Sequence, residues 1–317
     1  MLVVTGSDTV PEQAKGAVLA IGNFDGVHRG HQALITKVRE HAGKIGAAAG
    51  VIIFEPHPRE FFQPSEPHFH LTPLPLKLRR LEALRLDLVV VLTFDRNFAS
   101  LSANEFIEDV LVAKLAPRHI VIGYDFFFGK GRSGTPDTMR QAGPELGFGV
   151  TVVSPVAEDG EVFSSTTIRL KLAQGDVRGA TIGLGDTWRV SGRVIGGAKR
   201  GTGLGFPTAN IALERGTALA HGIYAAWVEI PGEESHGEKR ARRFMGAAYL
   251  GTRPTFDNGG PLLEIFLLDF DGDLYGQEIE VAFVDFIRGD RRFDSAEELV
   301  EQMHADCAKA REILSAE

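Results

Sequence analysis

The strongest constraint on the fold is a change of pattern near Gly183 to Asp186. Before this point, apolar runs alternate with segments of helical periodicity, which favours crossover units on a parallel, doubly wound sheet. After it, most segments alternate like β-strands between Gly, Pro and Asp turns, which favours a closed antiparallel barrel. A chain of 317 residues is long enough for two domains of about 150 residues each. We therefore expect domains at 1–183 and 184–317.

The first half contains five runs typical of buried strands: "GAVLAIG", "GVIIFEP", "DLVVVLTFD", "HIVIGYDF" and "VTVVSPV". Ligands of such sheets bind beyond the carboxyl ends of the strands. The second half ends in a predicted helix, where Ser295 and Glu298 form the pattern of a capping box. Leu299, Met303, Ala310 and Leu314 follow at helical spacing, so we expect this helix to pack on the barrel.

Composition excludes several classes of protein. The chain is 44% hydrophobic and 24% charged, and no apolar run approaches the ~18 residues of a membrane span. The N-terminus lacks the basic and apolar regions of a signal peptide, so we expect a cytoplasmic protein. The lone Cys307 favours a packing role, and a net charge of −8 argues against nucleic-acid binding. Small molecules are therefore the expected partners.

The segment "GNFDGVHRGHQ" occupies the turn between the strand at 17–21 and a helix that begins near Gly30. A helix N-terminus offers unpaired N–H groups, and glycines at 22, 26 and 30 let a phosphate approach the backbone. His28 and His31 can donate hydrogen bonds to nucleotide phosphates as negative charge develops. The alternative is that one histidine caps the helix while the other is exposed. The glycines and Asp25 favour a phosphate site.

Two other glycine patterns bear on nucleotide binding. Gly129, Gly131 and Gly134 spell G-x-G-x-x-G after a predicted strand, but no acidic residue ends the next strand, where "VVSPV" stands. A loop is the better interpretation of this segment. The sequence contains no G-x-x-x-x-G-K-[ST], so a kinase activity cannot use a P-loop.

Several motifs together resemble one family. "GNFDGVHRGH" is similar to the HxGH signature of nucleotidyltransferases, and "FSSTTIR" at 163–169 is similar to their second ATP motif. "FEPHPREFF", "VIGYDFFFGKGRSG" and "LGFPTANI", in this order, resemble the bacterial bifunctional riboflavin kinase/FAD synthetases along essentially the entire chain. The resemblance implies a Rossmann-like N-terminal domain and a C-terminal Greek-key β-barrel with a final helix. It also implies phosphorylation of riboflavin to FMN in the barrel and adenylyl transfer from ATP to FMN in the first domain, with release of pyrophosphate.

For adenylyl transfer, the resemblance implies that His28 and His31 are catalytic, that Arg169 clamps the triphosphate and that Mg²⁺ bridges it. The Ser/Thr run before Arg169 could also simply cap a helix, and both roles are compatible because caps and anions use the same N–H groups. Asp125 and Arg253 are implied flavin or nucleotide contacts, although family members often have Arg where this chain has Phe127. The expected ATP-binding residues of this domain are Gly22, Phe24, Asp25, Gly30, Ser164, Ser165, Thr166 and Arg169.

For the kinase, the segment "GGAKRGTGLGFPTANI" at 196–211 is the expected ATP loop. The resemblance implies that Thr208 and Asn210 coordinate Mg²⁺ through oxygen and that Glu264 accepts the proton of the riboflavin 5′-hydroxyl. The alternative is a Gly/Pro loop that leads into an ordinary strand. Two positions depart from the family pattern, Thr202 for Arg and Phe266 for His. The remaining expected ATP contacts are Gly197, Lys199, Gly205 and Pro207.

Two other functions remain open at this stage. In the first, changes at Thr202 and Phe266 impair the kinase, and the chain only adenylylates FMN supplied from elsewhere. In the second, the chain binds flavin or nucleotide as a regulatory module without turnover. The presence of both histidines, Arg169 and Glu264 argues against pure binding.

Overall fold

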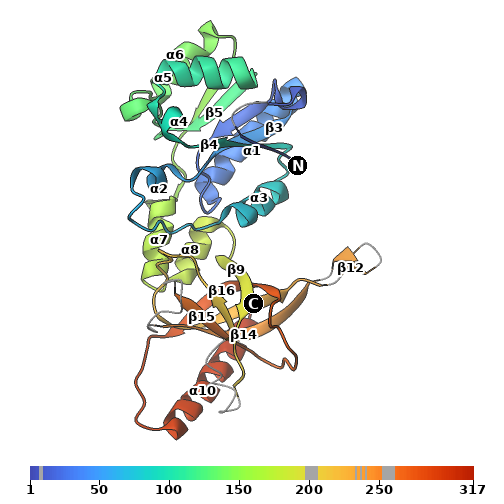
Figure 1. Cartoon of the computed structure of the whole chain (residues 1–317), viewed down its shortest axis with the longest axis vertical. Helices are drawn as coiled ribbons and strands as arrows, with labels where there is room; N and C mark the ends of the chain where they lie inside the picture. The colour runs from blue at the N-terminus through green and yellow to red at the C-terminus, as the bar shows by residue number, and fades with distance from the viewer. Residues whose placement is uncertain (7–9, 197–205, 233, 236–237, 240, 252–260) are drawn as a thin grey trace. The chain divides into compact units, whose positions relative to one another are not determined.

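A computed structural model gives the fold of the chain, apart from residues 7–9, 197–205, 233, 236–237, 240 and 252–260 (Figure 1). The chain forms two compact units. Unit 1 comprises Met1–Pro67 and Thr72–Ser165, and unit 2 comprises His68–Leu71 and Thr166–Glu317. Five positions singled out in the sequence lie outside the described residues: Gly197, Lys199, Thr202, Gly205 and Arg253.

Unit 1 is built on a six-stranded sheet in the order β1-β4-β3-β2-β5-β6, and all its strand pairs are parallel. This confirms the predicted parallel sheet, and β1 is a strand that the sequence analysis did not name. From β2 the chain adds β3 and then β4 on one side of β2, and it then crosses to add β5 and β6 on the other side. The switch point therefore lies between β2 and β5, where a ligand crevice is expected. The strands are β1 (Leu2–Thr5), β2 (Val18–Ile21), β3 (Ala49–Glu55), β4 (Leu88–Thr93), β5 (His119–Gly123) and β6 (Gly149–Val153).

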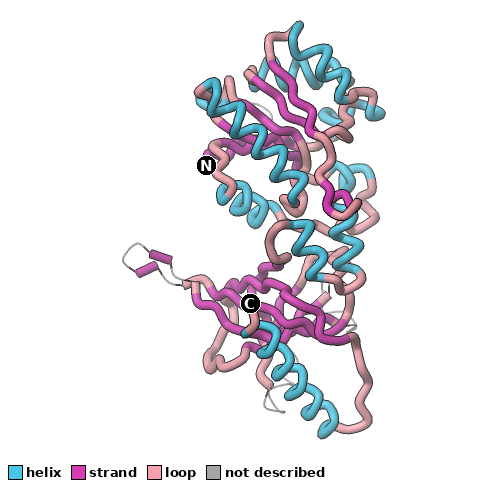
Figure 2. Tube along the Cα trace, turned by 180° about the vertical axis from the view of Figure 1, so that it is seen from behind, coloured by secondary structure: helices cyan, strands magenta, loops and turns pink. Residues whose placement is uncertain are grey.

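Helices cover both faces of this sheet (Figure 2). Alternate residues of β2 enter different cores: Leu19 and Ile21 pack on one face, and Val18 and Ala20 on the other. Both faces are apolar because parallel strands joined by crossover helices are buried on both sides. The other elements of this unit are η1 (Glu12–Ala14), α1 (Arg29–Ile45), α2 (Pro58–Phe62), α3 (Leu74–Ala83), α4 (Arg96–Ser100), α5 (Ala103–Glu105), η2 (Phe106–Leu115), η3 (Lys130–Arg132), α6 (Pro136–Glu145), β7 (Ala157–Glu158) and β8 (Glu161–Val162).

Unit 2 is a closed antiparallel barrel in the order β10-β15-β14-β11-β16-β9. The barrel and its C-terminal helix agree with the sequence prediction. Inward-facing residues alternate along each strand, as Leu263, Ile265 and Leu267 do in β15. The elements of this unit are α7 (Ser165–Ala173), α8 (Val177–Leu184), β9 (Arg189–Ile195), β10 (Ala209–Ala212), β11 (Gly222–Ile230), β12 (Glu234–Ser235), β13 (Glu238–Lys239), β14 (Arg242–Leu250), β15 (Leu262–Leu267), β16 (Glu278–Arg288) and α10 (Ala296–Ser315).

The barrel core extends beyond the predicted boundary at 183. Ile168 and Leu172 of α7 and Val177, Ala180 and Leu184 of α8 are buried in the same cluster as the inward-facing barrel residues. The short segment His68–Leu71 also belongs to this unit. The indole nitrogen of Trp188 donates a hydrogen bond to the carbonyl of Leu71 at 3.0 Å. The compact unit therefore starts at Thr166, because α7 and α8 bury their apolar faces with the barrel.

Helix α10 packs across β11, β14 and β16, as predicted. Ser295 caps it by accepting the N–H of Glu298 at 3.2 Å. The reciprocal half of the predicted capping box is absent, because the Glu298 carboxylate accepts the N–H of Asp294 instead. Arg288 of β16 holds the buried Asp306 through two hydrogen bonds of 2.9 and 2.7 Å. The helix is thus fixed by an ion pair in addition to its apolar contacts.

A barrel fragment that starts at 166 should unfold at a higher temperature than one that starts at 184. The longer fragment retains α7 and α8, whose apolar residues close one side of the core. We expect a difference of roughly 5 °C or more, since 1 kcal/mol shifts the midpoint by about 4 °C in a domain of this size. Thermal unfolding of both fragments, followed by circular dichroism, measures it. Equal midpoints would show that the barrel does not use these helices.

Two histidines form a polar contact in unit 1, where α1 packs against β5. The rings of His41 and His119 stack with centroids 4.0 Å apart. The hydroxyl of Thr151 lies 2.8 Å from Nε2 of His119 and 3.2 Å from Nε2 of His41. Burial, followed by the nearby His41, lowers the pKa of His119 to about 4. The neutral form of His119 is therefore favoured in the folded protein.

This pair should make unit 1 sensitive to acid. A histidine whose pKa is lower in the folded state contributes stability above its unfolded pKa of about 6.5, and this contribution is lost as the pH falls toward about 4. We expect the unfolding midpoint to fall between pH 7 and pH 4.5, and to fall less in a His119→Gln variant. His221→Gln, at an exposed histidine of unit 2, is the control. An unchanged pH dependence in His119→Gln would contradict this assignment.

Candidate active sites

The loop that joins β2 to α1 has an unusual backbone. Phe24 and Val27 have φ values of 50° and 47°, and Gly26 has a φ of 86°. Such conformations are costly for residues with side chains and persist where the surroundings enforce them. Phe24 is fully buried in the core next to the loop, with its ring beside Gly22. This predicted ATP-binding residue therefore shapes the loop from within.

Hydrogen bonds from distant segments hold the same loop in place. The carboxylate of Asp25 accepts the N–H of Thr72 at 3.0 Å, and the Thr72 hydroxyl accepts the N–H of Gly26 at 2.8 Å. Arg80 of α3 donates to the carbonyl of Gly26 at 3.1 Å. The Ser165 hydroxyl donates to the carbonyl of Asp25 at 2.8 Å. Asp25 and Ser165, both predicted to bind ATP, thus also fix the loop conformation.

His28 and His31 lie at the start of α1 with their rings stacked 3.6 Å apart. His28 caps the helix, because its Nδ1 faces the N–H of His31 at 3.4 Å. His31 as a whole is partly exposed, but its Nδ1 is buried. This nitrogen has no hydrogen-bond partner among the described residues. Gly30 packs closely beside them, since a Cβ there would lie 3.0 Å from the His28 ring and 3.2 Å from the carbonyl of Phe163. The predicted cap is thus present, together with a buried imidazole nitrogen that has no partner among the described residues.

Burial is the main reason that the pKa of His31 is well below its ordinary value. The neighbouring His28 and the charge of Lys77 lower it further. His31 is therefore a neutral imidazole near pH 7, with a buried nitrogen available to a ligand. A neutral imidazole can still donate one hydrogen bond to an anion without becoming charged.

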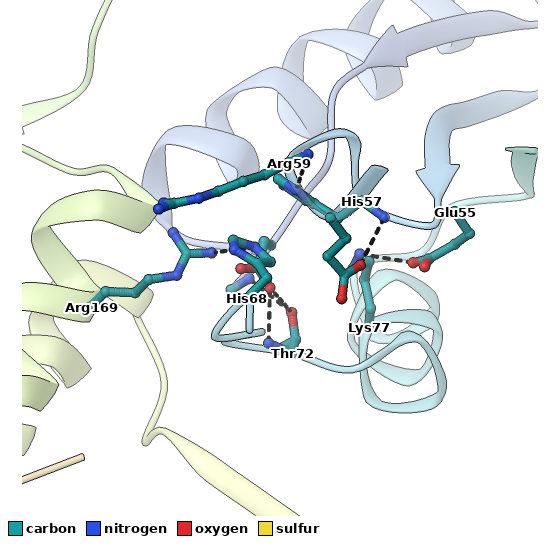
Figure 3. Close-up of polar contacts among 10 residues, drawn as sticks. Glu55, His57, Arg59, His68, Thr72, Lys77 and Arg169 are labelled. Atoms are coloured by element: carbon teal, nitrogen blue, oxygen red, sulfur yellow. Dashed lines mark hydrogen bonds and ion pairs between the residues drawn. The ribbon is translucent and has the colours of Figure 1, made fainter. Parts of the chain in front are cut away.

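The second predicted ATP motif spans the junction of the two units. Ser164 precedes α7 by one residue and, with Ser165, ends unit 1, whereas Thr166, exposed in the first turn of that helix, belongs to unit 2. Arg169 belongs to unit 2, where its Nε donates to the carbonyl of Phe69 at 2.7 Å. Its guanidinium also lies 3.2 Å from Nε2 of His68 (Figure 3). The guanidinium is thus positioned by the segment 68–71.

An aromatic cluster extends from Phe54, near the carboxyl end of β3, to the segments that follow β4 and β5. Each ring contacts at least one other ring of the cluster. The ring centroids of Phe61 and Phe94 are 5.4 Å apart at one end, and those of Phe126 and Phe128 are 5.4 Å apart at the other. The sequence analysis missed this cluster, although the runs "EFF" and "DFFFG" signal it. Phe62 is 65% exposed at one end of the cluster, whereas Phe54, Phe106 and Phe128 are buried in the core. The members are Phe54, Phe61, Phe62, Phe94, Phe98, Phe106, Phe126 and Phe128.

The segment after β5 adds polar groups beside this cluster. Asp125 is exposed two residues beyond the end of β5. The guanidinium of Arg132 lies 4.9 Å from the centroid of the Phe127 ring, so a cation stands close to this departure from the family pattern. Gly129 and Gly134 pack tightly against Ala103 and the Phe128 ring. These glycines therefore serve loop packing, as expected for a segment that is not a dinucleotide motif.

In the barrel, strand register brings the predicted kinase residues together. Asn210 of β10 pairs with Glu264 of β15, and Glu264 pairs on its other side with Tyr249 of β14. Their neighbours Ile211 and Leu263 are buried in the core, so these three side chains share the outer face. The sequence analysis missed Tyr249, because only the register reveals it. Gly251 leaves space for the Tyr249 ring, which a Cβ would overlap.

The residues before β10 present oxygen atoms. The Asn210 side chain is only 5% exposed, and its Nδ2 donates to the carbonyl of Thr208 at 3.2 Å. This orientation leaves Oδ1 as the available atom of the amide. Thr208 is half-buried and Pro207 is exposed. Hydroxyl, amide and carboxylate oxygens are the donor set that Mg²⁺ prefers, so Thr208, Asn210 and Glu264 fit that ion.

An aromatic group borders this face of the barrel. The Phe206 ring lies 5.0 Å from Phe266 of β15 and 4.9 Å from His304 of α10. Phe266 is a departure from the family pattern, which often has histidine there. His304 nevertheless supplies an imidazole to the same group. Phe206 therefore links Phe266 of the barrel to a histidine of the neighbouring helix.

Comparisons with known proteins match the two halves separately and together. The FAD synthetase family matches residues 10–167, and the riboflavin kinase family matches residues 184–314. The bifunctional riboflavin kinase/FMN adenylyltransferase of Pseudomonas fluorescens is 40% identical over 316 residues, which cover 98% of this chain and 97% of that protein. The protein of the same name from Escherichia coli strain K12 is 42% identical over 298 residues, which cover 94% of this chain and 93% of that protein.

A solved structure also shares the fold. The crystal structure of a macrolide-efflux protein from Streptococcus pneumoniae has a TM-score of 0.84 at 28% identity, covering 98% of this chain and 99% of that one. Within the part of this chain that the structure describes, no helix has both the length and the apolar character needed to cross a bilayer. The two matched halves and the near-full-length relatives agree: the chain belongs to the family of bifunctional riboflavin kinase/FMN adenylyltransferases.

Proposed function

We propose that this chain makes FAD from riboflavin in two ATP-dependent steps, one in each half. The barrel transfers the γ-phosphoryl group of ATP to riboflavin, giving FMN and ADP. The N-terminal half then transfers AMP from ATP to FMN, giving FAD and pyrophosphate. The observation that carries this proposal is that each half matches its own enzyme family and contains its own group of polar side chains.

In the adenylyl transfer, an oxygen of the FMN phosphate attacks the α-phosphorus of ATP. The bond from that phosphorus to the bridging oxygen breaks, and pyrophosphate leaves with the electron pair. His28 and the neutral His31 donate hydrogen bonds to the phosphates, and Gly22, Gly26 and Gly30 allow close approach to the backbone. The sequence motif assigns Ser164, Thr166 and Arg169 to the triphosphate, and Mg²⁺ supplies charge neutralisation when it is bound.

The flavin ring in this half stacks on the aromatic cluster. A flat, largely apolar ring system gains from contact with exposed aromatic side chains such as Phe62. Asp125 lies on the segment that follows β5 and contacts the flavin or nucleotide. Arg132, whose guanidinium lies over the Phe127 ring, supplies a cation for the phosphates of these ligands.

In the kinase half, Glu264 accepts the proton of the riboflavin 5′-hydroxyl while the oxygen attacks the γ-phosphorus of ATP and ADP leaves. Thr208 and Asn210 hold Mg²⁺, which supplies charge neutralisation on the phosphates when it is bound. The ATP loop is assigned from the sequence alone to Gly197, Lys199, Gly205 and Pro207. Arg253 is likewise assigned to flavin binding. The partners are these small molecules, and the chain acts in the cytoplasm without nucleic acid or membrane.

Glu264→Gln should block the first step alone. The variant keeps the shape of the side chain but removes the proton acceptor, so FMN formation should fall by roughly 10²- to 10⁴-fold. Supplied FMN should still be converted to FAD. Chromatography of flavins after incubation with ATP and Mg²⁺ measures both steps, and Glu278→Gln at an exposed glutamate of β16 is the control. Loss of FAD synthesis from FMN in the Glu264 variant would refute the assignment.

A His28→Asn/His31→Gln variant should block the second step alone. Asparagine is a good helix cap, so this change preserves the start of α1 while it removes both imidazoles. FMN should accumulate from riboflavin, and FAD formation should fall by at least ~10²-fold. If the wild-type chain produced no ADP from riboflavin and ATP, the kinase half would be inactive. Loss of FMN synthesis in a folded histidine variant would contradict the division of labour.

A further inference from the structure

Lys77 of α3 is a buried cation without a full set of partners. Its side chain is 2% exposed, and lysines are rarely buried to this degree unless they are paired. Its one side-chain partner among the described residues is Glu55, with Nζ and Oε1 3.4 Å apart (Figure 3). That single long contact uses one of the three donors of the ammonium group. The Glu55 side chain is itself partly exposed, so the pair compensates the burial of Lys77 only in part.

Neighbouring residues show that α3 presents Lys77 to the loop between β2 and α1. Thr72, just before α3, exchanges hydrogen bonds with Asp25 and Gly26. Arg80 donates to the carbonyl of Gly26 and lies three residues after Lys77, which places both side chains on one face of the helix. Glu55 is the last residue of β3, the strand next to β2. The ammonium group therefore lies at the carboxyl edge of the sheet.

The electrostatic environment links Lys77 to His31. The charge of Lys77 contributes to the lowered pKa of His31, after burial and His28. The buried Nδ1 of His31 has no partner among the described residues. A lysine ammonium, an unpaired imidazole and the N-terminus of α1 all favour a negative group. The carboxylate of Asp25 is already bonded to Thr72, and Glu55 meets only one donor of Lys77.

We propose that Lys77 binds a phosphate oxygen of the substrates in the adenylyltransferase site, a role that rests on the function proposed above. The ammonium neutralises charge on the phosphate groups as pyrophosphate leaves. Glu55 holds the ammonium at the sheet edge when the site is empty. Lys77 is then a binding and catalytic residue of the second step and has no part in the kinase step.

Neutral variants separate this role from a structural one. Lys77→Met removes the charge but leaves Glu55 without a cation, so a stability loss could hide the effect on activity. Lys77→Met/Glu55→Gln removes both charges and should unfold close to the wild-type temperature. We expect both variants to convert FMN to FAD at least ~10²-fold more slowly than wild type, with riboflavin phosphorylation unchanged as an internal control. Lys37→Met, at an exposed lysine of α1, is the matched control.

The outcomes are distinct. Recovery of FAD synthesis in the double variant to within about threefold of wild type would show that the pair is only structural and would overturn the proposal. A raised KM for ATP would assign Lys77 to the triphosphate, and a raised KM for FMN would assign it to the FMN phosphate; both support the proposal. If wild type itself converted no FMN to FAD, the proposed function would fail instead.

A second measurement uses the unaltered chain and decides the question if the neutral variants do not fold. Lysine labelled with ¹³C at Cε gives one signal per residue, and the Lys77 signal is identified by its loss in Lys77→Arg. Addition of FMN and α,β-methylene ATP, which cannot transfer AMP, should move this signal. A Lys77 signal that does not respond at saturating ligand would overturn the proposal.

Discussion

The N-terminal site depends on one buried residue, Thr72. It has no exposed surface, its N–H binds the carboxylate of Asp25, and its hydroxyl accepts the N–H of Gly26, 46 residues away in sequence. These bonds fix a loop whose backbone has positive φ at Phe24 and Val27. A local preference alone does not hold such a backbone. The positions of both histidines, the start of α1 and the face of α3 toward the loop follow from this contact.

Burial then determines the chemistry that the loop can perform. The low pKa of His31 keeps its imidazole neutral near pH 7, and Lys77 brings a positive charge to the same region. The carboxylate of Asp25 is bonded to Thr72, and Glu55, the partner of Lys77, is partly exposed. Groups arranged in this way stabilise an incoming anion without reorganising, which is the main requirement of adenylyl transfer.

In the barrel, strand register has the corresponding role. Glu264 faces outward between Asn210 and Tyr249 only because β15 pairs with β10 and β14 in one particular alignment. A slip by one residue would turn Glu264 into the core and Ile265 out of it, so burial of the apolar face enforces the position of the carboxylate. The stability of the barrel and the geometry of its site thus have the same cause.

The sequence by itself determined the parallel sheet, the barrel, the packing of the final helix and the turn that carries His28 and His31, because these depend on periodicity and turn residues within a few positions. Only the tertiary structure showed that α7, α8 and residues 68–71 belong with the barrel, that Glu298 does not complete the cap of Ser295, and that Tyr249 stands beside Glu264. It alone distinguished Lys77 from an ordinary helix lysine. Each of these features depends on packing between segments far apart in the chain, and local residue patterns do not encode which distant surfaces meet.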